Sequence, residues 1–258
     1  DLVVFGDSLS DVGNAYWLSG EAYPAYGYIA EGRFTNGPTW LQQFSKRLGV
    51  EEPMHCYGLH GGTNFAYGGA ETGYGWSYRD TPNLGNQINR YLNRPEPPSA
   101  DTLFVVWGGP NDIFEALEEG KHPQEVAARA EQAVRNLDVH IKTLADAGAR
   151  QFLVPNLPAF GSTPYGGEIE DLYSNFGLEL DLNEDVCKVF NSELVGTLND
   201  IRGVHPSITI NEADKFNTDI YTHMVDVVEN PDVYGFDNVS DAAIEAVMED
   251  PNADISGY

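Results

Sequence analysis

The sequence lacks long apolar runs and has few basic residues. Phe104–Trp107 and Phe152–Val154 are strand-length apolar stretches, well short of the roughly 18 residues that span a bilayer. Only 14 Lys and Arg residues oppose 40 Asp and Glu residues, so the formal net charge is −26. Such a chain repels the phosphates of nucleic acids and of anionic lipids. We therefore expect no nucleic-acid partner and no transmembrane segment, while the oligomeric state stays open.

Cysteine is also scarce, and the common metal and nucleotide motifs are missing. Cys56 and Cys187 are the two cysteines, far apart and without metal-ligand spacing. They fit one disulfide in an exported protein or two buried free thiols, and the sequence leaves both open. No HExxH, CxxC, P-loop or GxGxxG pattern occurs. We expect no metal and no cofactor.

Short apolar segments alternate with helical patterns along residues 1–258, which we interpret as one domain. Strands are expected at 2–5, 54–57, 103–107, 151–154 and 208–210. Helices are expected at 38–48, 84–92, 123–147, 182–201 and 216–228, a loop at 161–176, and a weak helix within 234–258. This alternation predicts an α/β fold: a flavodoxin-like three-layer α/β/α sandwich with a five-stranded parallel sheet in the order 2-1-3-4-5.

The first strand runs directly into Gly6-Asp7-Ser8, which reads as a turn. Taken alone, this stretch favours a turn or a helix cap over a catalytic serine. Ligands of open α/β sheets bind beyond the carboxyl ends of the strands, at the point where the strand order reverses. Ser8 ends the first strand and Asn111 follows the third, so the two should meet there. This placement favours Ser8 as a nucleophile.

Acyl transfer needs a nucleophile and hydrogen-bond donors for the oxyanion that develops on the carbonyl. Ser8 offers a hydroxyl and a backbone N–H. The glycine-rich turn near Gly69 offers a second N–H, and the side-chain amide of Asn111 offers a third donor. The residue types therefore suit ester chemistry.

These motifs together resemble the GDSL family of SGNH hydrolases, in its secreted lipase, esterase and phospholipase-like branch. The matching stretches, in the family's order, are Gly6–Asp11, Gly32–Pro38, Asn64–Ala70, Gly109–Asp112, Asn230-Pro231 and Tyr234–Phe236. The resemblance implies that Ser8 is the nucleophile and that Gly69 and Asn111 complete the oxyanion hole. Gly68 is the alternative glycine. Asp7 and Asp11 are expected to support the site.

The chain departs from the family in its catalytic base. The family carries its catalytic Asp and His in a late Asp-x-x-His block, and no histidine here follows an Asp by three residues. Arg202 stands where that Asp would precede His205, and His223 is expected on a solvated helix face, one turn after Asp219. The other histidines are His55, His60, His122 and His140, expected in loops or at exposed helix positions.

The expected block should begin about where the chain ends, at Tyr258, so we expect a C-terminal truncation. The resulting expectation is a carboxylic ester hydrolase that forms an acyl-enzyme on Ser8, impaired for want of the Asp and His. The alternatives are a non-catalytic pseudo-hydrolase that binds acyl or glycan groups, and an acyltransferase. The substrate is expected to be a small-molecule, lipid or glycan ester. The location is expected to be secreted or periplasmic, with any signal peptide already removed.

Overall fold

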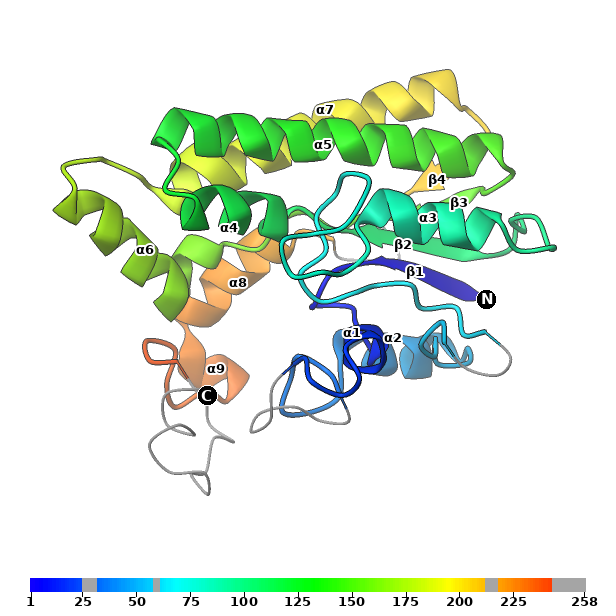
Figure 1. Ribbon diagram of the computed structural model, residues 1–258, viewed down its shortest axis with the longest axis horizontal. Coiled ribbons are helices and arrows are strands. Elements are labelled where there is room, and N and C mark those ends of the chain that lie inside the picture. Colours follow the sequence, from blue (N-terminus) through cyan, green and yellow to red (C-terminus); the bar gives the residue numbers. More distant parts are fainter. Residues whose placement is uncertain (25–31, 58–60, 212–217, 243–258) are drawn as a thin grey trace.

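A parallel sheet forms the centre of the computed structural model, which describes residues 1–24, 32–57, 61–211 and 218–242. Within these residues the sheet has four strands in the order β1-β2-β3-β4. They are β1 (Leu2–Gly6), β2 (Leu103–Trp107), β3 (Gln151–Leu153) and β4 (Thr209–Ile210). Helices flank the sheet (Figure 1), so the expected α/β class is confirmed, with four strands in place of five.

The expected strand at 54–57 does not form, and a later segment takes its place beside β1. Val4 N–H donates to Thr63 O (3.0 Å), and Phe65 N–H donates to Val4 O (2.7 Å). Residues 54–57 form no strand with this segment: they meet it at an isolated bridge between His55 and Asn64 and through the side chain of Tyr67. The free edge of β1 is therefore covered by the glycine-rich segment itself.

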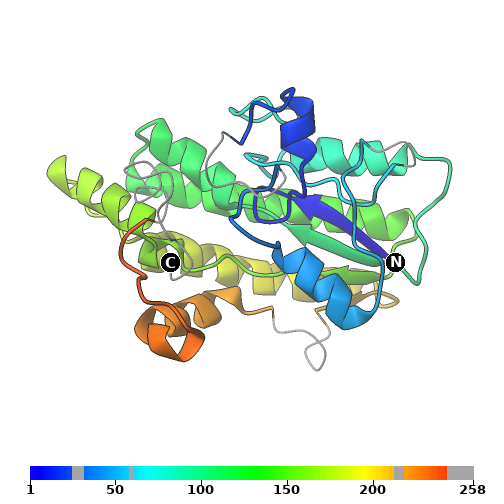
Figure 2. The same cartoon turned by 90° about the horizontal axis from the view of Figure 1, so that it is seen from below.

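Helices cover both faces of the sheet. On one face lie α3 (Leu84–Leu92), α5 (Pro123–Asp146) and α7 (Lys188–Val204), above the strands in Figure 1. The opposite face is covered by α2 (Trp40–Leu48), which lies in front of the strands in Figure 2. The predicted apolar stripe of α5 is buried, at 3% exposure or less: Val126, Ala130, Val134, Leu137, Ile141 and Leu144.

Several short helices lie in segments that the sequence pattern assigned to loops or left open. The clearest is α6 (Pro164–Asn175), inside the loop expected at 161–176. Thr163 caps it by accepting a hydrogen bond from Gly166 N–H, and Pro164 occupies the first turn. The others are α1 (Asn14–Leu18), α4 (Pro110–Glu118), α9 (Pro231–Tyr234) and a 3₁₀ turn at Phe160–Ser162. The helix expected at 216–228 is present as α8 (Ile220–Glu229), and the one expected at 182–201 begins with a π-helical turn at Leu182–Cys187 that leads into α7.

Cys56 and Cys187 are both buried and free, so the alternative of two thiols holds and the disulfide does not form. In the ranges listed above, no helix is long and apolar enough to cross a membrane. The same ranges contain no group of three or more His, Cys, Asp or Glu side chains arranged to hold a metal ion. The weak helix expected within 234–258 lies largely outside the described residues.

Candidate active site

Ser8 lies in a tight turn that begins where β1 ends. Ser10 N–H donates to Asp7 O (3.1 Å), and Leu9 N–H donates to the Asp7 carboxylate (3.0 Å). The Asp7 side chain is buried, whereas Ser8 is partly exposed. The turn therefore presents the Ser8 side chain at the carboxyl end of the sheet.

A buried glutamine fixes the last residue of β1. Gly6 N–H donates to Gln87 Oε1 (3.0 Å), and Gln87 Nε2 donates to Gly6 O (2.9 Å) and to Pro82 O (3.0 Å). A Cβ atom on Gly6 would lie 2.6 Å from Trp107 O, so only glycine fits between the strands here. Gln87 is 81 residues from Gly6, and sequence reasoning did not single it out.

The glycine-rich segment reaches the same end of the sheet. Tyr67 N–H donates to Gly6 O (3.1 Å), which places Gly68 and Gly69 just beyond β1. Gly68 N–H donates to Asp11 Oδ2 (2.8 Å) and is therefore occupied. Gly69, at φ 80°, donates no hydrogen bond from its N–H within the described chain. Of the two glycines, Gly69 has the N–H free for a ligand.

Asn111 approaches from β2. Gly109, at φ 134°, turns the chain after the strand, and α4 begins at Pro110. A Cβ atom on Gly109 would lie 2.7 Å from the Phe190 ring, so this turn also requires glycine. Asn111 Nδ2 donates to Ala70 O (3.0 Å) with one of its two hydrogens. These contacts join the three segments that contain Ser8, Gly69 and Asn111 at one end of the sheet.

Three buried carboxyl groups surround these segments. Burial raises the pKa of Asp7 to about 7, and Asp7 Oδ2 has no hydrogen-bond partner in the described residues. Burial also raises the pKa of Asp11, but only to about 6, because four backbone N–H groups donate to that carboxylate. Burial raises the pKa of Asp112 to about 7, against two hydrogen bonds from Thr72.

Two buried asparagines tie the Ser8 turn to the glycine-rich segment. Asn64 Nδ2 donates to Ser10 O (2.7 Å). Asn14 Nδ2 donates to Asn64 O (3.0 Å) and to Ala66 O (2.9 Å), and Asn14 Oδ1 accepts from Cys56 N–H (2.9 Å). Sequence reasoning missed this role of both side chains; Asn64 lay in a recognised block, but its partners are far away in the sequence.

The histidines differ from expectation at one position. His140 is only 1% exposed, so the prediction of an exposed helix position was wrong. Its Nε2 lies 2.6 Å from Thr72 O, a carbonyl that the glycine-rich segment brings onto α5. His122 is exposed at the start of α5, and His205 follows the end of α7. The structure does not describe His60.

Asp219 and His223, one helical turn apart in the sequence, lie in the chain after β4. Asp219 caps α8 by accepting from Thr222 N–H (3.1 Å), and it also accepts from Asn156 Nδ2 (2.9 Å). His223 is exposed on α8, as expected, with its ring edge-on to Tyr234. Ser8 forms no hydrogen bond to any histidine in the described part of the chain.

Comparisons with known proteins show a matching family model and relatives of similar sequence. A family model described as GDSL-like Lipase/Acylhydrolase matches residues 2–245. A GDSL esterase/lipase of Arabidopsis thaliana is 28% identical over 283 residues, covering 93% of this chain and 72% of the relative. The phosphatidylcholine-sterol acyltransferase of Aeromonas hydrophila is 30% identical over 164 residues, covering 63% of this chain and 46% of the relative. A solved carbohydrate esterase aligns with a TM-score of 0.35 at 15% identity, over 78% of this chain and 67% of the other.

Proposed function

The chain belongs to the GDSL-like lipase/acylhydrolase family, and on this premise we propose that it is a carboxylic ester hydrolase with Ser8 as its nucleophile. Membership supports ester hydrolysis or acyl transfer in general. The observation that carries the specific proposal is the free Gly69 N–H, joined through Ala70 to the Asn111 amide beside the Ser8 turn. A purely structural turn has no need of unoccupied donors at this place.

In the proposed reaction, Ser8 Oγ attacks the carbonyl carbon of the ester. The carbonyl oxygen gains negative charge and accepts hydrogen bonds from Ser8 N–H, Gly69 N–H and Asn111 Nδ2. The C–O bond to the alcohol then breaks, and the alcohol leaves with a proton. Water attacks the resulting acyl-enzyme, which releases the acid and restores Ser8. Asp7 and Asp11 support this site by holding the backbone around Ser8 and Gly68.

The proton of the Ser8 hydroxyl needs an acceptor. No described histidine is hydrogen-bonded to Ser8, so we infer slow turnover for this 258-residue chain. Loss of the base from a serine triad costs several orders of magnitude in kcat, and the oxyanion hole supports the residual rate. The nucleophile should still react with an activated phosphonate, whose leaving group needs little help.

Aromatic rings beside the proposed donors favour an apolar acyl chain or a sugar ring as the bound group. A Cβ atom on Gly68 would lie 2.0 Å from the Phe34 ring, so this ring lies directly on the glycine. Tyr23 packs edge-on against Phe34 at 5.0 Å. Aromatic faces bind both acyl chains and sugar rings. The proposed substrate is therefore a small-molecule, lipid or glycan ester.

Acyl transfer to an alcohol is the second candidate, favoured by the similarity to the Aeromonas acyltransferase. The acyl-enzyme is the same, and an alcohol replaces water in the second step. We also propose a secreted or periplasmic location, in line with the branch that the motifs resemble. Cell fractionation followed by detection of the protein tests the location, and recovery in the cytoplasm alone would overturn it.

Labelling with a fluorophosphonate tests the nucleophile. We expect the chain to be labelled, the Ser8→Ala variant to remain unlabelled, and the Ser10→Ala variant in the same turn to be labelled as before. Labelling that persists in Ser8→Ala would remove Ser8 from its role. A folded chain that is not labelled, yet binds acyl or glycan groups, would indicate the pseudo-hydrolase. Product analysis with an added alcohol separates hydrolysis from transfer.

A further inference from the structure

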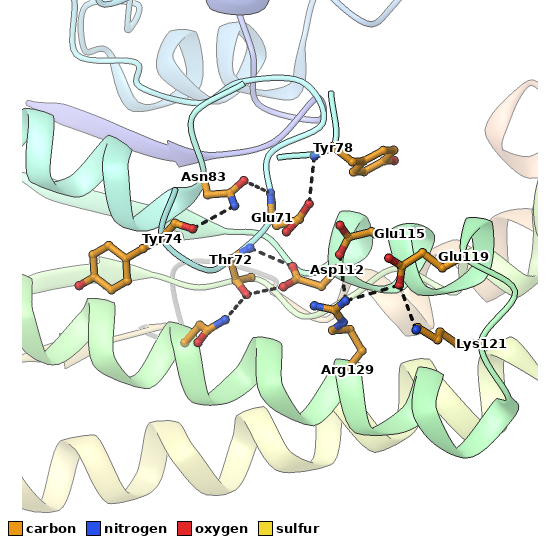
Figure 3. Close-up of polar contacts among 11 residues, drawn as sticks. Glu71, Thr72, Tyr74, Tyr78, Asn83, Asp112, Glu115, Glu119, Lys121 and Arg129 are labelled. Carbon is orange, nitrogen blue, oxygen red and sulfur yellow. Dashed lines mark hydrogen bonds and ion pairs between the residues drawn. The ribbon is translucent and has the colours of Figure 1, made fainter. Parts of the chain in front are cut away.

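Thr72 lies three residues after Gly69, and all its polar groups are bonded. Its N–H donates to Asp112 Oδ2 (2.9 Å), and its hydroxyl donates to Asp112 Oδ1 (2.8 Å). Figure 3 shows Thr72 and Asp112 facing each other between the loop and α4. Asn136 Nδ2 donates to Thr72 Oγ1 (2.9 Å), and His140 Nε2 lies 2.6 Å from Thr72 O. Thr72 is completely buried.

The direction of each hydrogen bond follows from the chemistry of the groups. A carbonyl oxygen only accepts, so His140 carries its proton on Nε2. Its Nδ1 is then a bare lone pair, and this atom is buried without a partner in the described residues. Asn136 donates to the Thr72 hydroxyl, which in turn donates to Asp112. The donor-to-acceptor direction of this series of hydrogen bonds, from α5 through Thr72 to α4, is therefore fixed.

The network is attached next to both proposed oxyanion donors. Asp112 follows Asn111 in α4, and Ala70, whose carbonyl accepts from Asn111, is two residues before Thr72. Asn136 and His140 are four residues apart, so they lie on the same face of α5. The loop is thus joined to α4 at two adjacent points and to α5 at two more. A glycine-rich loop without such contacts would have a wide choice of conformations.

We propose that Thr72, Asn136 and His140 are positioning residues that fix the Gly69 N–H relative to the Asn111 amide. The inference rests on the proposed function, since it assigns these two groups as oxyanion donors. Donors stabilise an oxyanion only when they are held at hydrogen-bond distance from the place where the charge develops. Thr72 anchors the end of the glycine-rich loop. Its hydrogen bonds to Asp112 connect the loop to α4, and the hydrogen bonds from Asn136 and His140 connect Thr72 to α5.

The test compares Thr72→Val, which keeps the shape and removes the hydroxyl, with Thr72→Ser, which keeps the hydroxyl. We expect fluorophosphonate labelling of Ser8 to slow between about tenfold and 100-fold in Thr72→Val, as for a small misplacement in an active site. Thr72→Ser should stay within about threefold of the unmodified chain, on the scale of a neutral contact change. Ester hydrolysis should lose kcat with little change in KM. Asn136→Leu, at a partly exposed position, provides the same test if Thr72→Val fails to fold.

A double-mutant cycle with Asn111→Ala separates positioning from a general loss of stability. If Thr72 acts through the donors, Thr72→Val should cost less than about threefold once Asn111 has been truncated. An unchanged labelling rate in folded Thr72→Val, or an equal loss in both backgrounds, would overturn the inference. Ser45→Ala, which removes a buried hydroxyl bonded within α2, serves as control and should keep the full rate. Failure of the proposed function is recognised separately, by labelling that survives Ser8→Ala.

Discussion

The turns that follow β1 and β2 contain buried carboxyl groups, whereas the chain after β4 leads into helices without a buried residue. Asp7, Asp11 and Asp112, in the first region, are at most 4% exposed. In the second region, neither α8 nor α9 contains a fully buried residue, and His223 is exposed. The difference separates the groups that we propose to bind the oxyanion from the region in which Asp219 and His223 lie near the surface.

The end of β1 and the chain after β3 share one way of holding the backbone, in which a side-chain amide bonds the N–H and the C=O of a single residue. Gln87 does this to Gly6, the last residue of β1, Asn211 does it to Val154 after β3 (2.7 and 2.7 Å), and Asn191 does it to Leu157 (2.8 and 3.0 Å). A backbone held by a side-chain amide is therefore found both at the end of β1 and after β3. The turns after β1 and β2 differ in that they also contain the Gly69 N–H, which has no acceptor in the described chain, and the buried carboxyl groups.

Removal of the Asn111 amide is expected to have the largest effect on the reaction. Asn111→Ala should slow labelling of Ser8 and ester hydrolysis by about 100-fold, because it removes one oxyanion donor. The measurement is the second-order labelling rate of the folded variant, with folding checked by circular dichroism. A rate within threefold of the unmodified chain would contradict the assignment of donors to the first region.

Removal of the Gln87 amide should destabilise the fold and slow the chemistry. Gln87→Met leaves the buried Gly6 N–H without an acceptor, and we expect a loss of about 3 kcal/mol in the free energy of unfolding. Urea titration measures the loss. Asn191→Leu is the matched variant after β3: it should destabilise as well, but keep the labelling rate. Equal effects of the two variants on labelling would show that the end of β1 has no special part in the reaction of Ser8.

Asp7 should make stability depend on pH. Its folded pKa, about 7, is raised above the ordinary value of 3.8, so its contribution is fully present below pH 4 and is lost as the pH rises through 7. Asp7→Asn should therefore gain stability relative to the unmodified chain between pH 4.5 and pH 8, on the order of 2 kcal/mol. Urea titrations at both pH values test this, and equal slopes with pH for both proteins would contradict it.

The smallest effect is expected at His223. His223→Ala should change ester hydrolysis by less than about twofold, because an exposed side chain that does not touch Ser8 contributes little to its reactivity. Initial rates with a nitrophenyl ester measure this. A loss of 100-fold or more would show that the second region supplies the base, and the contrast between the regions would then be between two halves of one working site.

The local pattern of apolar residues predicted many of the strands and helices and the faces that they bury. The apolar runs of β1 and β2 and the stripe along α5 are buried as expected, since strand and helix periodicity directly reflect which faces meet the core. Gly69 and Gly109 both take positive φ, as their places in tight turns suggest. The grouping of Ser8 with Asn111 followed from the rule for strand ends and did not require coordinates.

The sequence by itself therefore determined the layers of the fold, and it located the proposed site and its residue types at one end of the sheet. Only the tertiary structure decided that 63–67 takes the place beside β1, that Gln87 holds Gly6, and that His140 is buried on Thr72. Each of these depends on hydrogen bonds between residues far apart in the chain. Such pairs leave no periodic trace in the sequence, because the partner of a buried polar group is chosen by proximity after the core has packed.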